Sequence, residues 1–306
     1  MRARAAGARL GLAVVVLWGA VTVGFAALQL MDGGTLDLIL GTSSQATPEV
    51  RRQIIADYGL DRSVPEQYAT YLWHVLHGDL GRSYQLRVPV SEAIGDQLPA
   101  TLALTSCALA LAVVVAVVVA LLTAHRAPWL RGGFAATETV ALSVPQFWFG
   151  TLLLIVFSFT LRLFPAAGGL ALPAVALAVT PAGMLAQVLR KGLEDALDEP
   201  FVVTARARGL GDGAVRLRHA LRHALLPAVT LTGWLIGTTL GGAVVVEQVF
   251  SRPGIGRLTL TAVTNKDMPV VMGVVLVAAL VYVTCSLAVD VLYRLIDPRL
   301  RTEAAA

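Results

Sequence analysis

Six long apolar runs restrict the fold of this chain more than any other feature. They cover residues 10–31, 98–124, 134–161, 170–189, 225–246 and 268–292, and each is about 20 to 28 residues long. A helix of about 20 apolar residues crosses a bilayer, and only closed helices satisfy their own backbone hydrogen bonds in lipid. Only 14% of the 306 residues are charged and the mean hydropathy is +0.72. Soluble, disordered, collagen-like and disulfide-stapled classes are therefore excluded, and we expect an all-α polytopic membrane protein with six transmembrane helices.

Basic residues predict how the helices are oriented in the membrane. The first run follows Arg2, Arg4 and Arg9, but at about 22 residues it exceeds a signal-peptide core, so we expect an uncleaved span. With the N-terminus inside, 15 of the 24 Lys and Arg residues fall in inner segments. Five of the other nine lie in one long loop, which the positive-inside rule discounts. We expect a multi-pass protein of the plasma (inner) membrane with both termini cytoplasmic.

The connections between runs suggest four parts. These are residues 1–31 (N-terminal tail and first span), 32–97 (an extracytoplasmic helical cap), 98–295 (a transmembrane domain with spans two to six) and 296–306 (a cytoplasmic tail). The cap is expected to be helical because Val50, Ile54 and Tyr58 recur at helical spacing after Pro48. A second amphipathic stretch carries Tyr68, Leu72, Val75 and Leu76 and ends before Gly78.

The inner loop, residues 190–226, is the most charged part of the chain. We expect two short helices here: Pro200 starts the first, Gly209–Gly213 separates them, Asp212 caps the second, and Pro227 begins the fifth span. One apolar face of the second helix would hold Leu217, Leu221, Ala224 and Leu225, beside rows formed by Arg218 with Arg222 and His219 with His223. Periodicity leaves two interpretations open: a helix that meets anionic headgroups, or a docking element for a cytoplasmic partner.

Four stretches in order carry a more specific signal. They are 204–210 (TARARGL) with 218–222 (RHALR) and 225–227 (LLP); 78–83 (GDLGRS) with 88–90 (VPV); 247–258 (EQVFSRPGIGRL) with 267–271 (DMPVV); and Asp290, Tyr293 and 297–299 (DPR). Together they resemble the permeases of binding-protein-dependent ABC importers, in the dipeptide, oligopeptide and nickel branch. The glutamate of the general loop motif is replaced by Val203 when Gly209 is aligned, and the gap from Gly209 to Pro227 exceeds that of sugar importers. We take both as features of the peptide branch.

The resemblance implies a type I ABC importer permease that moves peptides or a related small solute by alternating access. It implies a homologous second permease, two ATPase subunits and an extracytoplasmic solute-binding protein as partners. ATP and Mg would be bound by the ATPase subunits, and this chain would bind no cofactor and would not be an enzyme. The solute stays open among dipeptides, oligopeptides, glutathione and chelated nickel.

The resemblance also implies three groups of site residues. The first group is the ATPase-coupling loop, with Thr204, Ala205, Ala207, Gly209, Leu210, Arg218, His219, Leu221 and Pro227. The second is the family hallmark in the cap, with Gly78, Asp79, Leu80 and Gly81. The third is the outer gate or pathway, with Glu247, Arg252, Pro253, Gly254 and Gly256. Pro253, Gly254 and Gly256 also permit a sharp turn that would be costly against lipid, so the turn should face protein or a water-filled cavity. Gly233, Gly237, Gly241 and Gly242 would allow close packing beside a solute path between spans two to five.

Other classes of function find less support in the residues. Neither lysine, Lys191 or Lys266, stands in a Walker-type phosphate loop, so nucleotide energy must come from another subunit. His219 and His223 have metal-ligand spacing, but no third ligand is apparent, and a serine hydrolase would need a buried histidine that the spans lack. Cys107 is expected to be a small buried hydrophobe, as is Cys285.

Two alternatives remain: a secondary transporter or channel that works alone, and a membrane sensor or scaffold. The first would lead us to expect a charged residue at mid-span for ion coupling. Glu138, Glu247 and Asp290 instead lie near the ends of predicted spans. For Glu138 and Asp290 an interfacial position is favoured over a proton relay, and for Glu247 the two are evenly balanced.

Overall fold

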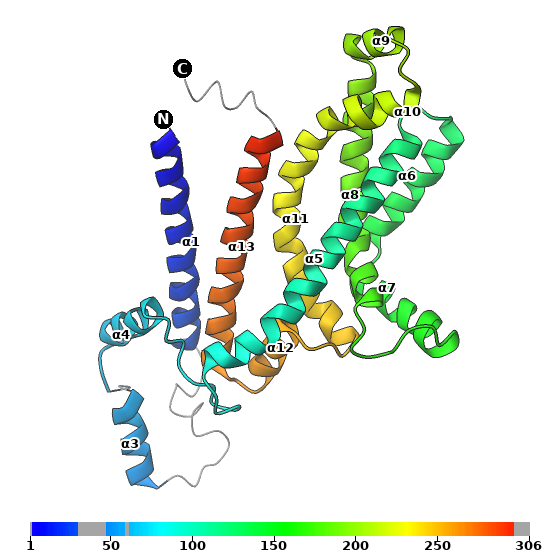
Figure 1. Cartoon of the computed structure of the whole chain (residues 1–306). Coiled ribbons are helices and arrows are strands. Elements are labelled where there is room, and N and C mark those ends of the chain that lie inside the picture. The colour runs from blue at the N-terminus through cyan, green and yellow to red at the C-terminus, as the bar shows by residue number, and fades with distance from the viewer. Residues whose placement is uncertain (1, 30–46, 59–60, 297–306) are drawn as a thin grey trace. The chain divides into compact units, whose positions relative to one another are not determined.

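The computed structural model describes residues 2–29, 47–58 and 61–296, and Figure 1 shows their arrangement. The chain divides into two compact units: unit 1 is residues 1–99 with 257–283, and unit 2 is residues 100–256 with 284–306. All regular structure in the described residues is helical, apart from one antiparallel bridge between Arg82 and Pro89. The all-α prediction is thus confirmed. Residues 32–46 and 59–60 of the expected cap and 297–306 of the expected tail lie outside the described residues.

The helices follow the order of the apolar runs. Those within unit 1 are α1 (Arg2–Gln29), α3 (Pro48–Tyr58) and α4 (Val64–Leu76); those within unit 2 are α6 (Pro128–Ser143), α7 (Gln146–Leu153), α8 (Ala171–Leu197), α9 (Pro200–Ala207), α10 (Asp212–Ala214) and α11 (Leu221–Val249). Three more, α5 (Val90–Thr123), α12 (Ile255–Thr264) and α13 (Met268–Ile296), have residues in both units. Two π-helical segments, η1 (Leu154–Thr160) and η2 (Val215–Ala220), follow α7 and α10.

Among the described residues, four helices are long and apolar enough to cross a membrane. They are α5, α8, α13 and one long helix, Asp212–Val249, made of α10, η2 and α11. A fifth is reached if α6 and the helix after it, Gln146–Thr160, count as one broken span. The apolar part of α1, Gly11–Ala27, is shorter than the other four.

The third apolar run differs from its expected form as one continuous helix. The helix breaks after Ser143, and the two halves are bent by 105°. Val144 has an extended ψ of 125°, which is the conformation that a following proline favours. Pro145 also has no N–H to continue the helical hydrogen bonds. Residues 134–161 therefore form a bent pair, and the expectation of a single helix was wrong.

In unit 1, α4 is held at both of its ends. Its first turn contains Pro65, and the backbone N–H of Ser63 donates to Glu66 Oε2 at 3.0 Å. Hydrogen bonds from Ser63, chiefly from its side chain, hold the pKa of the Glu66 carboxyl below its usual value. Tyr68, predicted on the apolar face, contacts α1 through a 2.7 Å hydrogen bond to Thr22 Oγ1 and an edge-on ring contact with Phe25.

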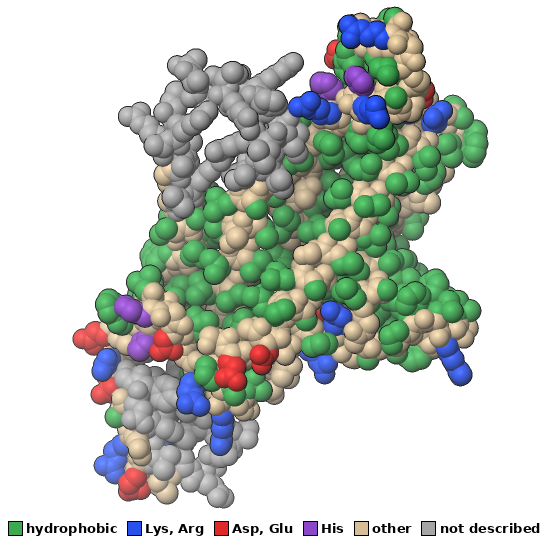
Figure 2. Space-filling model, viewed as in Figure 1, with side chains coloured by type: hydrophobic (Ala, Val, Ile, Leu, Met, Phe, Trp, Pro, Cys, Tyr) green, Lys and Arg blue, Asp and Glu red, His purple; other side chains and the backbone are tan. Residues whose placement is uncertain are grey.

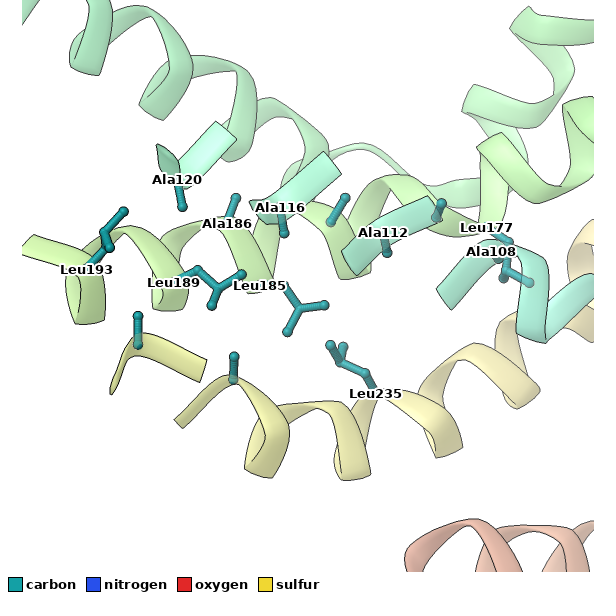
Figure 3. Packing of buried hydrophobic residues seen from close by; sticks show 14 of the residues in the cluster. Ala108, Ala112, Ala116, Ala120, Leu177, Leu185, Ala186, Leu189, Leu193 and Leu235 are labelled. Atoms are coloured by element: carbon teal, nitrogen blue, oxygen red, sulfur yellow. The ribbon is translucent and has the colours of Figure 1, made fainter. Parts of the chain in front are cut away.

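The core of unit 2 combines small residues of α5 with leucines of α8 and α11. On α5 the alanines recur at every fourth position, which places them on one helix face, and all are fully buried: Ala108, Ala112, Ala116, Ala120 and Ala124. Figure 3 shows four of them beside Leu185, Leu189 and Leu193 of α8, with Leu235 of α11 opposite. Because alanine is small, it allows neighbouring helix backbones to come close.

Glycines extend this close packing between α8 and α11, though not all of those expected. A Cβ on Gly192 would lie 3.1 Å from the Cα of Ala224, and one on Gly242 would lie 2.6 Å from Gln146 Oε1. A Cβ on Gly241 would meet nothing within 4 Å. Close packing therefore depends on Gly242, which was expected, and on Gly192, which was not singled out from the sequence.

Enlarging one alanine of the α5 stripe tests this packing. We expect Ala116→Leu to destabilise the protein by about 1–3 kcal/mol, since its side chain is fully buried. The measurement is the midpoint temperature of heat-induced aggregation in detergent. Val114→Leu is the matched control because Val114 is 60% exposed on the same helix. Equal midpoints for the two variants would contradict the packing described for α5.

Candidate functional site

Helix α9 and the turn after it form the best-defined part of the inner loop. The helix begins at Pro200 after Glu199, as predicted, and ends in a Schellman motif. In that motif Gly209 N donates to Arg206 O at 2.9 Å, and Leu210 N donates to Ala205 O at 3.3 Å. Gly209 has φ +82°, a left-handed conformation that glycine adopts at no steric cost. A Cβ at this position would meet nothing within 4 Å, so a larger side chain would project into open space.

The two faces of α9 differ in exposure. Val202 and Ala205 are buried, whereas Thr204 and Ala207 are exposed, as is Val203 at 71%. Leu210 is half-buried after the turn. In Figure 2 the Lys, Arg and His side chains gather around α9 and the neighbouring helix ends, while the flanks of the longer helices of this unit are mostly hydrophobic. The outward face of α9 is thus an exposed apolar and basic surface.

The second helix of the inner loop begins one residue earlier than expected and continues without a break into α11. Gly211 is its N-cap and Asp212 its first residue, so Asp212 is not the cap. Pro227 lies inside α11 and is exposed, so it does not begin the helix. Neighbouring helices and local adjustment allow a membrane helix to tolerate an internal proline.

The π-helical segment η2 changes which side chains point inward. Leu217 was expected on the buried apolar face but is 57% exposed, while Leu221 and Ala224 are buried as expected. Val215, Arg216 and Ala220 take the inward positions in η2. A π turn bonds residues five apart, which rotates the side chains relative to a regular α-helix. Helical periodicity alone could not predict this shift.

Asp212 has a different role from the predicted one. Its carboxylate accepts from Arg216 Nε at 2.7 Å and from Arg206 Nη2 at 3.2 Å, and Arg126 Nη2 lies 3.7 Å away. Arg216 is 7% exposed, and its Nη1 donates to the carbonyl of Ala124 at 2.6 Å. The four-residue spacing of Asp212 and Arg216 on a helix could have predicted their ion pair, but no sequence pattern predicted the hydrogen bond from Arg216 to Ala124.

Arg218 and Arg222 differ from Arg206 and Arg216 of the same loop, which bind Asp212. Arg218 and Arg222 are exposed, and no ion pair to either is found within the described part of the chain. His219 between them is half-buried, and its Nδ1 is a buried atom with no hydrogen-bond partner among the described residues. Arg208 is also exposed, so within the described residues three guanidinium groups of the inner loop, those of Arg208, Arg218 and Arg222, form no ion pair.

Unit 1 contains the hallmark stretch of the cap as a tight, well-bonded loop. Gly78 (φ +78°) closes α4 in a second Schellman motif, with Asp79 N donating to His74 O at 2.9 Å. Asp79 Oδ1 accepts from Gly81 N at 2.9 Å, and Gly81 is also left-handed at φ +80°. Leu80 lies beside Gly273, where an added Cβ would be 3.6 Å from its Cδ1.

This loop is fastened to a residue far away in the sequence. Asp267, just before α13, is 2% exposed. Its Oδ2 accepts from Ser83 Oγ at 2.5 Å, and its Oδ1 accepts from Tyr84 N at 3.1 Å. A third bond comes from Gln85 N at 3.3 Å. Ser83 and Asp267 both lie in the stretches that carry the resemblance, but their contact was not predicted.

The residues of the expected outer gate surround Glu247, whose side chain is fully buried. Thr101 Oγ1 donates to Glu247 Oε1 at 2.5 Å and itself accepts from Ile255 N at 2.8 Å. Gly256 N donates to Glu247 Oε2, also at 2.8 Å. Glu247 therefore organises the turn of residues 250–256 at the end of α11.

The glycines of this turn are required by closeness to Glu247. Neither Gly254 nor Gly256 has a positive φ; the left-handed residue here is Ser251 at +47°. A Cβ on Gly254 would collide with the Glu247 carboxylate, and one on Gly256 would collide with the Cα of Val244. The sequence therefore identified the right glycines for the wrong reason.

Arg252 of the same turn is fixed to backbone. Its Nη1 donates to the carbonyls of Gly168 and Gly169, both at 3.1 Å, and its side chain is half-buried. Pro253 beside it is exposed. Arg252 thus joins the end of α11 to the connection between η1 and α8.

Glu138 forms a buried ion pair between α6 and α8. It is 4% exposed, and Arg190 binds it bidentately, Nη1 to Oε1 at 2.5 Å and Nη2 to Oε2 at 2.8 Å. Such a pair neutralises a carboxylate that would otherwise be costly to bury. The side chain of Asp290 lies outside the described residues.

Across the described residues, no group of three or more His, Cys, Asp or Glu side chains could hold a metal ion. His219 and His223 therefore have no third ligand within that part of the chain. The features that the geometry does present are an exposed short helix, two fastened loops and several long apolar helices.

These features and the family comparison define the class of protein. The chain belongs to the family described as "Binding-protein-dependent transport system inner membrane component", whose model matches residues 112–302, more than half of the chain. It is thus a multi-pass membrane permease subunit of an ABC importer, and its role is transport rather than enzymatic catalysis. Membership of this family implies an ATPase and a solute-binding protein as partners.

Individual relatives are similar over nearly their whole length. The chain is 35% identical to a putative peptide transport system permease protein of Brucella abortus (strain 2308), over 96% of this chain and 97% of the relative. It is 33% identical to the dipeptide transport system permease protein DppB of Escherichia coli (strain K12), with the same coverage. It is also 33% identical to the oligopeptide transport system permease protein AppB of Bacillus subtilis (strain 168), over 94% of this chain and 96% of the relative.

The contact between Gly256 and Glu247 leads to a prediction with a built-in control. We expect Gly256→Ala to lower stability by about 1–3 kcal/mol, because the new methyl would meet the α11 backbone at Val244. The control is Gly241→Ala. Gly241 lies on α11 with open space around it, so an alanine there should raise stability by up to about 1 kcal/mol through helix propensity. Thermal midpoints in detergent measure both. Shifts of the same sign would contradict the close approach of the α11 backbone at Val244 to Gly256.

Proposed function

We propose that this chain is one of two permease subunits in an importer of di- or oligopeptides or a closely related small solute. The peptide assignment is supported by the names of the relatives, which are similar over at least 94% of this chain. The observation that carries the transport mechanism is α9, an exposed helix joined through a rigid turn to a helix long enough to cross the membrane.

The proposed topology has six spans with both termini in the cytoplasm. The spans are α1, α5, the bent α6–α7 pair, α8, the long helix 212–249, and α13. The distribution of basic residues in the sequence supports this orientation. The parts are those expected from the connections: 1–31, 32–97 as an extracytoplasmic cap, 98–295 as the transmembrane domain, and 296–306.

The proposed assembly adds a homologous second permease, two ATPase subunits that bind ATP and Mg, and a solute-binding protein that docks on the cap with its hallmark loop. The inner loop enters the ATPase subunit through α9. Its outward residues Thr204, Ala207 and Gly209 make contact there, while Ala205 and Leu221 hold the loop against unit 2. Val203, an exposed apolar side chain on the same helix, adds to the contact surface. Leu210, Arg218, His219 and Pro227 complete the coupling loop.

The proposed outer gate is the turn of residues 250–256 with Glu247. Closure of the ATPases on ATP displaces the inner loop, and the permease halves change from one arrangement to the other, which opens the solute path outward. Glu247 holds the turn in a fixed shape, and Arg252 holds its outer end. Neither side chain needs to contact the solute for this role.

Reconstitution tests the proposal directly. The chain, the adjacent second permease, both ATPases and the binding protein are placed in proteoliposomes with radiolabelled peptides of two to five residues. We expect uptake that needs ATP and every subunit. Uptake by this chain alone without ATP would instead establish the alternative, a secondary transporter.

Gly209 provides the sharpest single test of the coupling loop. We expect Gly209→Trp to lower uptake at least about tenfold while ATP hydrolysis and membrane abundance remain, because the indole fills space that the ATPase would occupy and the left-handed turn costs about 1–2 kcal/mol. Uptake and phosphate release are measured in the same vesicles.

Gly132→Trp is the control for Gly209→Trp. Gly132 is also exposed, with nothing within 4 Å of an added Cβ, but it lies on α6, outside the inner loop. It should keep the uptake of the unchanged protein. Normal uptake by Gly209→Trp at normal abundance would rule out α9 as the coupling element.

A further inference from the structure

Two polar contacts join α5 to the long helix 212–249, one near each end of the long helix. From them we infer that these two helices move as one body, so that Thr101 and Arg216 are positioning residues that carry a displacement of the inner loop to the turn of residues 250–256. This inference rests on the proposed function, because it specifies how the coupling loop reaches the outer gate. All of the groups involved lie within unit 2.

The first contact lies beside the inner loop. Arg216 Nη1 donates to the carbonyl of Ala124, directly after the last residue of α5, at 2.6 Å. The last carbonyls of a helix have no partner within the helix and carry its negative dipole end, so a buried guanidinium is well suited to them. The same guanidinium donates through Nε to Asp212, which also binds Arg206 of α9. A displacement of α9 is therefore passed to both helices.

The second contact lies at the other end of the long helix. Glu247 accepts from Thr101 of α5 and from Gly256 N, while Thr101 Oγ1 also accepts from Ile255 N. Thr101 is 5% exposed and Glu247 is fully buried. One hydroxyl thus bonds to a carboxylate of the long helix and to the backbone of the turn. The turn cannot shift relative to either helix without breaking these bonds.

The distance between the two contacts prevents one helix from pivoting against the other. On α5 they are about 35 Å apart, at 1.5 Å per residue from residue 101 to residue 124. A helix attached at one point can pivot about it, whereas attachment at two distant points prevents pivoting. The buried alanines of α5 lie between the contacts and pack in the cluster that includes Leu235 of the long helix (Figure 3).

Neither positioning residue is placed to contact a solute. Arg216 is bonded to a carbonyl and a carboxylate at the inner loop, and both bonding directions of the Thr101 hydroxyl are used. Their removal should leave solute recognition intact and should weaken the connection between ATP hydrolysis and transport. A residue that serves only folding would lower abundance and both activities together.

The test uses the complete importer in proteoliposomes and the variants Thr101→Val and Arg216→Gln, alone and together. Phosphate release and uptake of radiolabelled dialanine and tetra-alanine are measured in parallel. We expect each single variant to lower uptake per ATP hydrolysed at least about threefold, and the pair at least about tenfold. Arg216→Lys, which keeps a cation near the α5 carbonyls, should restore part of this ratio.

Matched controls separate the contacts from general damage. Thr105→Val removes a buried hydroxyl one turn further along α5, whose bonds are only to the carbonyls of residues 101 and 102 of its own helix. Arg131→Gln removes a half-exposed arginine of α6 that pairs with Glu194. Both should keep the ratio of the unchanged protein. If the double variant does not fold, the uptake per ATP hydrolysed by Thr101→Val alone tests the inference. Valine has the shape of threonine, so this variant removes the hydroxyl without changing the packing.

Distances between spin labels give a second, independent measurement. Labels at positions 114 and 234, which are exposed on α5 and α11, are introduced after Cys107 and Cys285 are replaced. We expect a narrow distance distribution that is the same without nucleotide and with ATP plus orthovanadate, and a broadened one in the double variant. A distance that changes with nucleotide in the unchanged protein, or a double variant with normal coupling and a narrow distribution, would overturn the inference.

The two measurements also distinguish this inference from the proposed function. If the unchanged importer shows no ATP-dependent peptide uptake, the proposed function fails. The width of the distance distribution without nucleotide is read without any uptake, so it still decides whether the two contacts hold the helices together.

Discussion

Backbone N–H and C=O groups within a bilayer have no water to bond to, and this constraint governs where the helices of this chain can be interrupted. At several interruptions a side chain replaces the missing partner. Asp267 accepts from the backbone of Tyr84 and Gln85, and Glu247 accepts from the backbone of Gly256. Arg252 donates to two loop carbonyls near Gly168. Among the buried polar side chains, Ser83, Glu247 and Asp267 lie at or next to turns of the chain, whereas Thr105, Glu138 and Thr239 lie within helices. The turns carry the family resemblance.

Pro145 and Pro227 show how tertiary contacts decide between outcomes that the residue type leaves open. At Pro145 the helix breaks and bends by 105°. At Pro227 the helix continues, because the preceding turn packs closely on α8, where the Cα of Ala224 lies against Gly192. Removing one helical hydrogen bond has a similar cost at both positions. The different outcomes at Pro145 and Pro227 therefore come from the contacts that the flanking residues make with neighbouring helices.

The glycines of the candidate site likewise serve different purposes. Gly78 and Gly209 each occupy the left-handed position of a Schellman motif, so their backbone conformation is the requirement. Gly254 and Gly256 have ordinary backbone conformations and are required because α11 lies against them, with the Glu247 carboxylate at Gly254 and the Val244 backbone at Gly256. Substitutions in the two groups should therefore fail for different reasons: conformational strain in the first and steric overlap in the second.

The sequence by itself determined the helical class, the order of the apolar helices, the start of α9 at Pro200 and the residues that mark the family, because hydrophobic length and proline or glycine chemistry act locally. It also separated α9 from the next helix at Gly209. Only the tertiary structure decided that the helix runs through Pro227, that η2 turns Leu217 outward, and that Arg216, Thr101 and Ser83 reach Ala124, Glu247 and Asp267. These contacts join residues about 90 to 180 positions apart, and no local pattern specifies which distant partner a buried polar side chain will meet.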